Sequence, residues 1–409
     1  MRGLIERAFV HRITASLFVV WCAPFVASCV HPCAEPSAPL EAAHTYEAET
    51  CARRAAMEAS VAAADTPYGT LRTAHYALGD GSTGDWDSLP VFSRPVRRLR
   101  VRGGSASDAA LDQGPVMRLE TDDIPGYVAA GERAFTRYPI QIDLGLSPLR
   151  DRTTAERMGF TVEDDGLVRG VIEVETSTGW TVSLTCAGCH AREIDGVEVL
   201  GVPSERIDLG SLLGHLEWPI GSVDVTSDGI ANPIRPADLR PIAYQSRLQH
   251  TGNLFNSRIA RMVRIETLMI SQLSENFRPE RDVVAAIALF LEAEGNALPR
   301  PDSSHEGAAL FSDTCGGCHR GEALSGPPVS VDVVGTDAVA TTGGQRGTGA
   351  YRAPSLLGVA ERRGLFHDGS AADLSAVLGL TESTHAGHRF GLALSREERE
   401  RIADYLGAR

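Results

Sequence analysis

The sequence contains no lysine, so all 39 of its basic residues are arginines. This absence excludes a catalytic lysine. Acidic residues outnumber the arginines, 53 to 39, and give the chain a formal net charge of −14. An acidic protein repels nucleic acid and anionic lipid headgroups, so we expect neither as a partner.

Long apolar runs are also scarce, and the clearest one lies at the N-terminus. Arginines precede an apolar stretch from Ile13 to Ser28, which is too short for a membrane span and contains Pro24. This pattern predicts a signal peptide over residues 1–28. The stretch ends Val26-Ala27-Ser28-Cys29, which resembles the lipobox of bacterial lipoproteins. The resemblance implies lipidation of Cys29 and an exported protein, in the periplasm or on the outer membrane, that associates with the membrane by its lipid anchor only. Simple cleavage nearby is the alternative.

Cysteine is limited to eight residues, and half of these occur in two copies of one motif. The copies are Cys186-Ala187-Gly188-Cys189-His190 and Cys315-Gly316-Gly317-Cys318-His319. Two cysteines two residues apart, followed at once by histidine, form the attachment pattern of c-type haem. One helical turn separates the thiols by about the distance between the two porphyrin vinyl groups, and the histidine can then bind the iron. The sequence therefore predicts two covalently bound haem c groups.

Two other interpretations of the motif are weaker. A four-cysteine zinc site uses two such cysteine pairs, but it gives no reason for His190 and His319 to follow them. A thioredoxin-like dithiol is cytosolic and usually single. Among the remaining cysteines, Cys33 and Cys51 could form a disulfide in an oxidising compartment, and whether they do stays open.

The apolar pattern and the two motifs predict a mainly α fold with two helical haem domains, which the resemblances described below imply to be cytochrome c-like. Apolar residues at helical spacing predict closing helices over Asp282–Glu294 and Glu397–Leu406. Alternation predicts a small β-hairpin, Leu167–Val174 with Trp180–Leu184, inserted in the first domain. The arginine-rich run 97–102 predicts an edge strand first and a partner-docking patch second. The expected segments are a tether and irregular N-terminal extension over 29–125, with a helix around Cys51–Ala64, a first haem domain over 126–298 and a second over 302–409.

Several short stretches resemble known haem proteins. Gly131–Phe135 and Gly307–Phe311 resemble the opening helix of cytochrome c domains, in which a glycine and an aromatic residue pack against the last helix. Tyr351–Val359 (YRAPSLLGV) and Leu365–Ser370 (LFHDGS) resemble the bacterial di-haem cytochrome c peroxidase superfamily, which includes di-haem maturation enzymes and rubber-cleaving oxygenases. That resemblance covers 307–406 and extends more loosely to Leu248–Asn253. It implies one reactive haem with an open or weakly held face, beside a six-coordinate haem that passes electrons.

The sixth ligand of the second haem is predicted to be a histidine. Haem iron takes histidine or methionine most readily in this role, and all six methionines precede residue 270. The family resemblance places this ligand in the loop before the final helix, which here contains His385 and His388. We predict His388, beside glycines that let the backbone approach the ring. His385 is the alternative, and an open iron is the third possibility.

The first haem has less clear candidates. By position, Met269 would be the analogue of His388, although a methionine in an apolar helix is more often a core residue. Trp218 could lie between the haems or over the distal face, or simply pack in a core. Glu266 could donate a distal proton, against a surface glutamate as the simpler interpretation. Arg346 and Arg352 could pair with haem propionates, with solvated arginines as the alternative.

Together these features predict a di-haem c-type cytochrome of the cell envelope that transfers electrons. Redox catalysis at the first haem, by activation of peroxide or oxygen, is the enzymatic hypothesis. A pure electron carrier with both haems six-coordinate is its rival. A redox partner protein or a small oxidant would be the partner, and the sequence identifies neither the substrate nor the electron donor.

Overall fold

The computed structural model describes residues 36–61, 86–103, 119–140, 145–224, 231–272, 277–342, 347–382 and 385–407. Residues Ala34–Arg409 form one compact unit. The predicted signal peptide, the lipidation residue Cys29 and the candidate Arg346 lie outside the described residues. Cys51 is disulfide-bonded, and its predicted partner Cys33 lies outside the described residues as well.

The fold mixes helices with small antiparallel sheets: among the described residues, 40% are helix and 16% are strand. Helix therefore predominates, as predicted, but the strands are more numerous than the one expected hairpin. None of the helices within the described ranges is long and apolar enough to cross a membrane.

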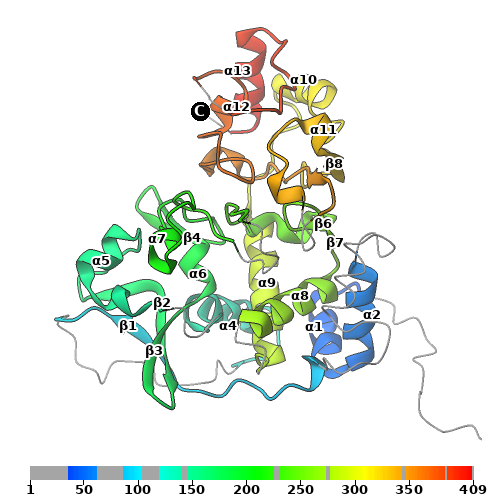
Figure 1. Ribbon diagram of the computed structural model, residues 1–409. Helices are drawn as coiled ribbons and strands as arrows, with labels where there is room; N and C mark the ends of the chain where they lie inside the picture. Colours follow the sequence, from blue (N-terminus) through cyan, green and yellow to red (C-terminus); the bar gives the residue numbers. More distant parts are fainter. Residues whose placement is uncertain are drawn as a thin grey trace, which may run out of the picture. The chain divides into compact units, whose positions relative to one another are not determined.

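Helix α9, Arg281–Ala297, is the centre of the larger core. Every residue from Val283 to Leu291 is buried, so this helix is apolar on all sides, which is typical of a helix enclosed by other elements. The helices α4 (Ile124–Arg137), α8 (Arg258–Gln272) and α1 (Pro39–Ala48) pack against it, as Figure 1 shows. The predicted helix over 282–294 is thus confirmed.

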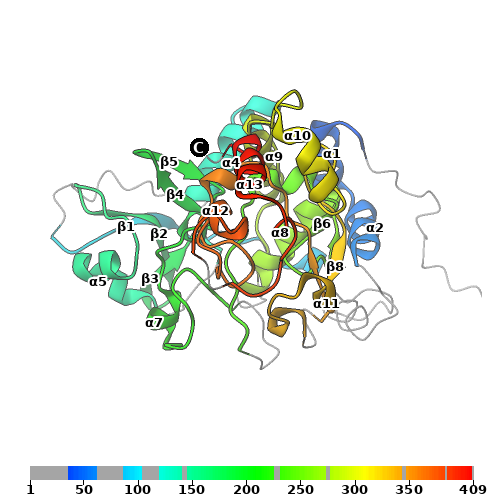
Figure 2. The same ribbon diagram turned by 90° about the horizontal axis from the view of Figure 1, so that it is seen from above.

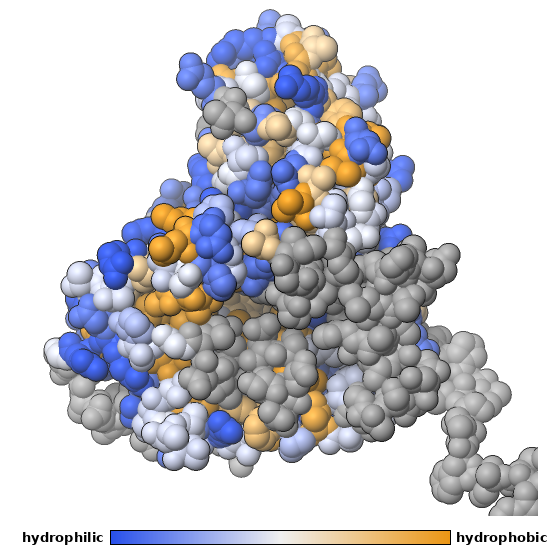
Figure 3. Space-filling model, in the orientation of Figure 1, coloured by the Kyte–Doolittle hydropathy of each residue, from blue (hydrophilic) through white to orange (hydrophobic). Residues whose placement is uncertain are grey.

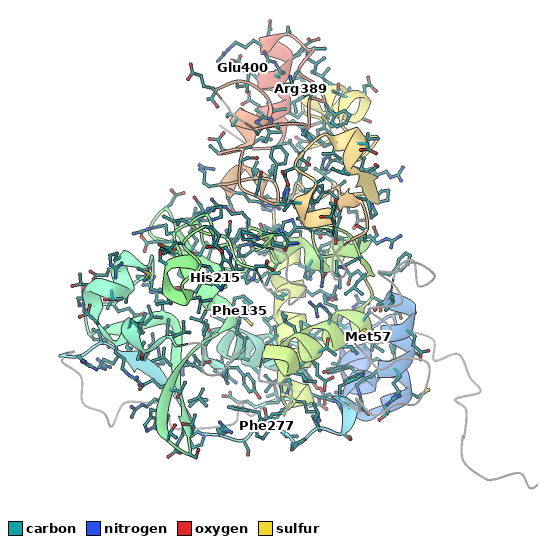
Figure 4. The ribbon with its side chains drawn as sticks, viewed as in Figure 1. Met57, Phe135, His215, Phe277, Arg389 and Glu400 are labelled. Carbon is teal, nitrogen blue, oxygen red and sulfur yellow. The ribbon has the colours of Figure 1, made fainter. Side chains whose placement is uncertain are left out.

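The N-terminal segment is more ordered than the sequence led us to expect. Where a tether was expected, residues 39–48 form helix α1, and α2 (Thr50–Ser60) follows it. Ala42, Tyr46 and Met57 recur on their inner faces and are fully buried against the core around α8 and α9. Figure 4 labels Met57 on α2. The irregular tether was therefore wrong for α1, because enough apolar side chains share one helical face to bury it. The helix expected around Cys51–Ala64 is confirmed as α2.

The predicted hairpin is confirmed as strands β2 (Leu167–Thr176) and β3 (Gly179–Leu184) of a three-stranded antiparallel sheet. The third strand is β1, Val96–Arg100, at the edge of the sheet beside β2. Its arginines pair with acids: Arg97 Nε lies 2.7 Å from Glu173 Oε2, and the Arg97 guanidinium covers the Trp180 ring. The arginine run is therefore an ion-paired edge strand, as predicted.

The remaining elements are short or belong to the C-terminal part. They are η1 Trp86–Ser88, η3 Ser147–Arg150, α5 Arg152–Arg157, α6 Cys186–Cys189, β4 Ala191–Ile194, β5 Val197–Leu200, α7 Leu209–Leu213, η4 Arg240–Tyr244, β6 Arg247–Leu248, β7 Leu254–Phe255, α10 Gly307–Thr314, β8 Pro328–Ser330, α11 Val331–Val334, η5 Val339–Thr341, β9 Ala350–Arg352, η6 Val359–Glu361, α12 Leu374–Val377 and α13 Arg396–Tyr405. Scattered apolar residues reach the surface between hydrophilic ones (Figure 3), which is ordinary for a folded chain.

The closing helix of the C-terminal part, α13, is confirmed together with its start signal. Ser395 and Glu398 form a capping box, in which each side chain accepts a hydrogen bond from the other's backbone N–H. Helix α13 lies beside α10 in both Figure 1 and Figure 2. The two helices and α12 enclose a smaller core that includes Phe311 and Ile402.

The same contact joins an opening helix to a closing helix twice in the chain. In α4, a Cβ on Gly131 would overlap the carbonyl oxygen of Ala286 in α9, and the Phe135 and Phe290 ring centres are 5.5 Å apart. Figure 4 labels Phe135 on α4.

The second copy of this contact joins α10 to α13. There, a Cβ on Gly307 would overlap the carbonyl oxygen of Arg401, and the Phe311 and Tyr405 ring centres are 5.2 Å apart. Both predicted glycine–aromatic contacts are confirmed.

Replacement of Gly131 by alanine tests this crossing. We expect Gly131→Ala to lower the free energy of unfolding by about 2 kcal/mol, because overpacking costs about 1–3 kcal/mol and the carbonyl of Ala286 cannot rotate away. The gain of about 1 kcal/mol in helix propensity offsets only part of this cost. Denaturant titration measures the loss. The matched control is Glu132→Ala at the exposed neighbouring position; equal stabilities for the two variants would contradict the close crossing.

Candidate functional site

The first Cys-x-x-Cys-His motif forms a single helical turn seated on the β-hairpin. Helix α6, Cys186–Cys189, directly follows β3, and the His190 N–H donates to the Cys186 carbonyl at 3.0 Å. Gly170 of β2, at φ +71°, lies so close to the turn that a Cβ would meet the backbone of Gly188. The predicted hairpin insertion therefore supports the motif directly.

The second motif has the same local geometry on a different support. Helix α10 runs into it, and the His319 N–H donates to the Cys315 carbonyl at 2.9 Å. A Cβ on Gly326 would overlap the carbonyl oxygen of Cys318, so this turn too is backed by a glycine. In both motifs, one helical turn holds two cysteines and directs the chain into the histidine.

The four motif cysteines are free thiols. Burial raises the pKa of Cys186 to about 12, and that of Cys189 and Cys315 to about 11. Within the described residues, no three or more His, Cys, Asp or Glu side chains are grouped to hold a metal ion. The two cysteine pairs therefore do not converge there into the four-cysteine zinc site of the alternative interpretation.

The imidazole of His319 is oriented by two backbone carbonyls. Its Nδ1 lies 3.1 Å from the oxygens of both Leu324 and Pro354, and the residue is only 9% exposed. Since a carbonyl can only accept, Nδ1 carries the proton and Nε2 keeps its lone pair. Burial also lowers the pKa of His319. A neutral imidazole with a free Nε2 and a carbonyl-bound Nδ1–H is the form that binds a metal ion.

His388 faces this imidazole. The ring centres of His319 and His388 are 6.4 Å apart, and the rings are tilted by 62°. Two imidazoles bound to one metal from opposite sides have centres about 6 Å apart, since each metal–nitrogen bond is about 2 Å long and each nitrogen lies about 1 Å from its ring centre. Burial, and then the nearby His319, lowers the pKa of His388 to about 4, so this imidazole is neutral as well.

The loop that presents His388 is held by unusual backbone. His388 has φ +44°, a left-handed conformation that is strained for a residue other than glycine, and such residues cluster at functional sites. Its N–H donates to the Val334 carbonyl at 2.6 Å. The preceding Gly387 crosses the backbone of Gly335 so closely that a Cβ would overlap it. Glycine is thus needed at position 387 because the chain contacts the neighbouring loop at Gly335. The expected reason, close approach of the backbone to a haem ring, is not the one seen. The alternative, His385, packs on Phe366 at 5.2 Å.

The environment of His190 differs from that of His319. Its Nδ1 is buried and makes no well-formed hydrogen bond within the described residues; a hydrogen bond to the backbone of Ala237 and the charge of Asp238 only partly offset the effect of burial on its pKa. Burial lowers its pKa to about 4. No second imidazole of the described residues faces it as His388 faces His319. The first motif therefore offers one candidate metal ligand, and the second motif two.

Arg352 is a buried cation that lacks an acidic partner in the described residues. It is 7% exposed, its Nε donates to the Gln249 carbonyl at 3.0 Å, and its Nη1 has no hydrogen-bond partner. Burial, and then the nearby Arg362, lowers its pKa to about 10. A buried guanidinium with an unsatisfied N–H is suited to an anionic group such as a haem propionate. This observation favours the propionate role over a solvated arginine.

An ion-pair cluster that no sequence pattern singles out lies near both motifs. Asp238 has a 1% exposed side chain and accepts from Arg240 Nη2 and Arg362 Nε, each at 2.9 Å. Arg240 also lies 2.7 Å from Glu361. The cluster joins segments more than a hundred residues apart, so only the folded chain brings its members together. A rise in arginine content after Gly358 was its only trace in the sequence.

The weaker candidates of the first motif occupy other surroundings. The Trp218 ring stacks on exposed His215, with centres 4.4 Å apart, in the loop after α7; Figure 4 labels His215. Met269 is buried in the core around α8 and α9, in the packing role considered for it. Glu266 is not on the surface but fully buried, where it accepts from the Tyr46 hydroxyl at 2.9 Å and pairs with Arg281.

Comparison with known proteins adds no relative. The chain matches no family model, and a search of curated proteins finds no match.

The buried Glu266 gives a pH prediction. Burial raises its pKa above the ordinary value, more than Arg281 lowers it. The folded carboxyl therefore holds a proton at a pH where the unfolded one, with a pKa of about 4.3, has lost it. Stability consequently falls as pH rises between the two pKa values.

Glu266→Gln cannot ionise, so its unfolding free energy should rise relative to wild type across this window. Denaturant titrations from acid to neutral pH measure the difference; Glu132→Gln, at an exposed position, serves as control. A pH-independent difference would refute the prediction.

Proposed function

We propose that this chain is a di-haem c-type cytochrome of the bacterial cell envelope that transfers electrons. The observation that carries the proposal is the paired geometry of the two Cys-x-x-Cys-His turns. Each turn has two free thiols one helical turn apart. Each also has a neutral histidine whose backbone N–H donates to the carbonyl of the first cysteine. Cys186, Cys189 and His190 would hold one haem, and Cys315, Cys318 and His319 the other. Haem supplies a one-electron redox centre when bound.

The repeated helix crossing supports two related haem domains. Gly131 with Phe135 and Gly307 with Phe311 make the same glycine and aromatic contacts to their closing helices. This similarity is what the resemblance to cytochrome c domains implies, and it comes from residues outside the motifs. We assign the proposed domains to residues 126–298 and 302–409, with α1 and α2 packed against the core of the first.

The surroundings of the second motif favour a closed haem. His319 Nε2 is available, and His388 lies at the distance that two imidazoles sharing one iron require. Arg352 would neutralise a propionate. Bis-histidine ligation favours low-spin iron and gives a lower potential than histidine–methionine ligation.

The surroundings of the first motif favour a more open haem. Since none of the described histidines faces His190 as His388 faces His319, the distal side of the first haem is the candidate site for a small oxidant such as peroxide or oxygen. The enzymatic hypothesis, a di-haem oxidoreductase resembling the peroxidase superfamily, depends on this asymmetry. A pure electron carrier, with both irons six-coordinate, is the second candidate. We also propose export and, by Cys29, a lipid anchor.

Covalent attachment is the first test. We expect haem to remain with the polypeptide after acid–acetone extraction, at two per chain by mass spectrometry. Cys186→Ala and Cys315→Ala should each remove or weaken one attachment, because each deletes one thioether. Cys51→Ala, which changes a cysteine outside the motifs, is the control and should keep both haems. Complete extraction of haem from the wild-type chain would refute the proposal.

Coordination of the second haem is the next test. His388→Ala should convert one of the two haems from low-spin to high-spin and open it to cyanide, because His319 would be its only remaining protein ligand. The visible and electron paramagnetic resonance spectra report the change. His385→Ala is the matched control and should leave the spectra unchanged. If both irons of the wild type are low-spin and resist cyanide and peroxide, the pure electron carrier is correct.

A further inference from the structure

The buried cluster around Asp238 is the part of the molecule whose chemistry is not used by the sites above. Its carboxylate is 1% exposed and lies between two guanidinium groups, Arg240 and Arg362. Arg240 follows Asp238 almost directly in the chain, whereas Arg362 comes from the C-terminal part. The Asp238–Arg362 bond therefore joins the segment behind the first motif to the segment behind the second.

On one side, the cluster touches the backbone that surrounds His190. The Gly201 N–H donates to the His190 carbonyl at 2.8 Å, and the Leu239 N–H donates to the Gly201 carbonyl at 2.9 Å. Ala237, next to Asp238, lies beside the His190 ring. The negative charge of Asp238 acts on this imidazole and raises its pKa, against the larger effect of burial.

On the other side, the cluster touches the backbone that orients His319. Arg362 Nη1 donates to the Ser355 carbonyl at 2.8 Å. The preceding carbonyl, that of Pro354, is one of the two that accept from His319 Nδ1. A short series of covalent and hydrogen bonds therefore connects the Asp238–Arg362 ion pair to His190 on one side and to His319 on the other.

We infer that the Asp238–Arg362 ion pair is the positioning element that couples the two haems and sets their potentials as a pair. The inference rests on the proposed function. A buried negative charge stabilises the oxidised, more positive iron and lowers its potential, and a buried positive charge raises it. Asp238 lies on the side of the first haem and Arg362 on the side of the second. Each charge acts on both sites because the surroundings are buried, and most strongly on the nearer one.

Redox titration of the purified holoprotein, followed by visible absorption, tests the inference. Asp238→Asn should raise both midpoint potentials, and more so at the first haem. Arg362→Gln should lower both, and more so at the second. Asp87→Asn is the matched control. The Asp87 side chain is also buried, at 9% exposed, and also lies between two arginines, Arg53 and Arg281. It should leave both potentials unchanged.

A variant with both changes guards against misfolding, since a single substitution leaves a charge unpaired in the interior. The double variant, Asp238→Asn with Arg362→Gln, removes both charges of the pair. It should raise the potential of the first haem and lower that of the second, so the gap between them changes. Potentials that stay at their wild-type values in this variant, or a shift in only one haem, would overturn the inference while leaving the di-haem assignment intact. A chain without covalent haem would overturn both.

Discussion

The close crossing of an opening helix and a closing helix is the constraint on which the rest of the structure depends. At Gly131 and Gly307, the backbone of one helix touches a carbonyl of the other, and no side chain larger than hydrogen fits between them. Phe135 and Phe311 then pack one turn further along. Each crossing fixes where its helix ends, and in the second half the helix leads straight into the cysteine motif. The position of the motif thus follows from a contact outside it.

Much of this architecture could be predicted from the sequence because its causes are local. The apolar run in residues 282–294 reflects a helix buried on all sides, and the alternation in 167–184 reflects strands with a buried face. Helix α1 was missed because its buried face is rich in alanine, which contributes little to an apolar pattern, although Ala42 and Tyr46 are fully buried. Their burial depends on the presence of α8 and α9, which follow some two hundred residues later.

The same distinction separates the predicted and the unexpected parts of the candidate site. The cysteine motifs could be selected from residue type and spacing alone, and the loop of His388 from the family resemblance together with the lack of a methionine there. By contrast, Asp238 is an ordinary acid in the sequence, and its importance arises only when Arg362 comes to lie beside it. Glu266 differs from Asp238 in the opposite way. The sequence marked it as a possible proton donor, whereas the structure places it in a buried ion pair with Arg281.

The exclusive use of arginine has a consequence for the interior of the molecule. Arg352 is buried with no acid beside it among the described residues, and burial lowers its pKa only to about 10. A lysine in that place, with a lower intrinsic pKa, would be driven towards neutrality by the same burial. The charge of Arg352 is therefore permanent at neutral pH. The positive field that it adds to the interior is one that a change of pH near neutrality does not switch off.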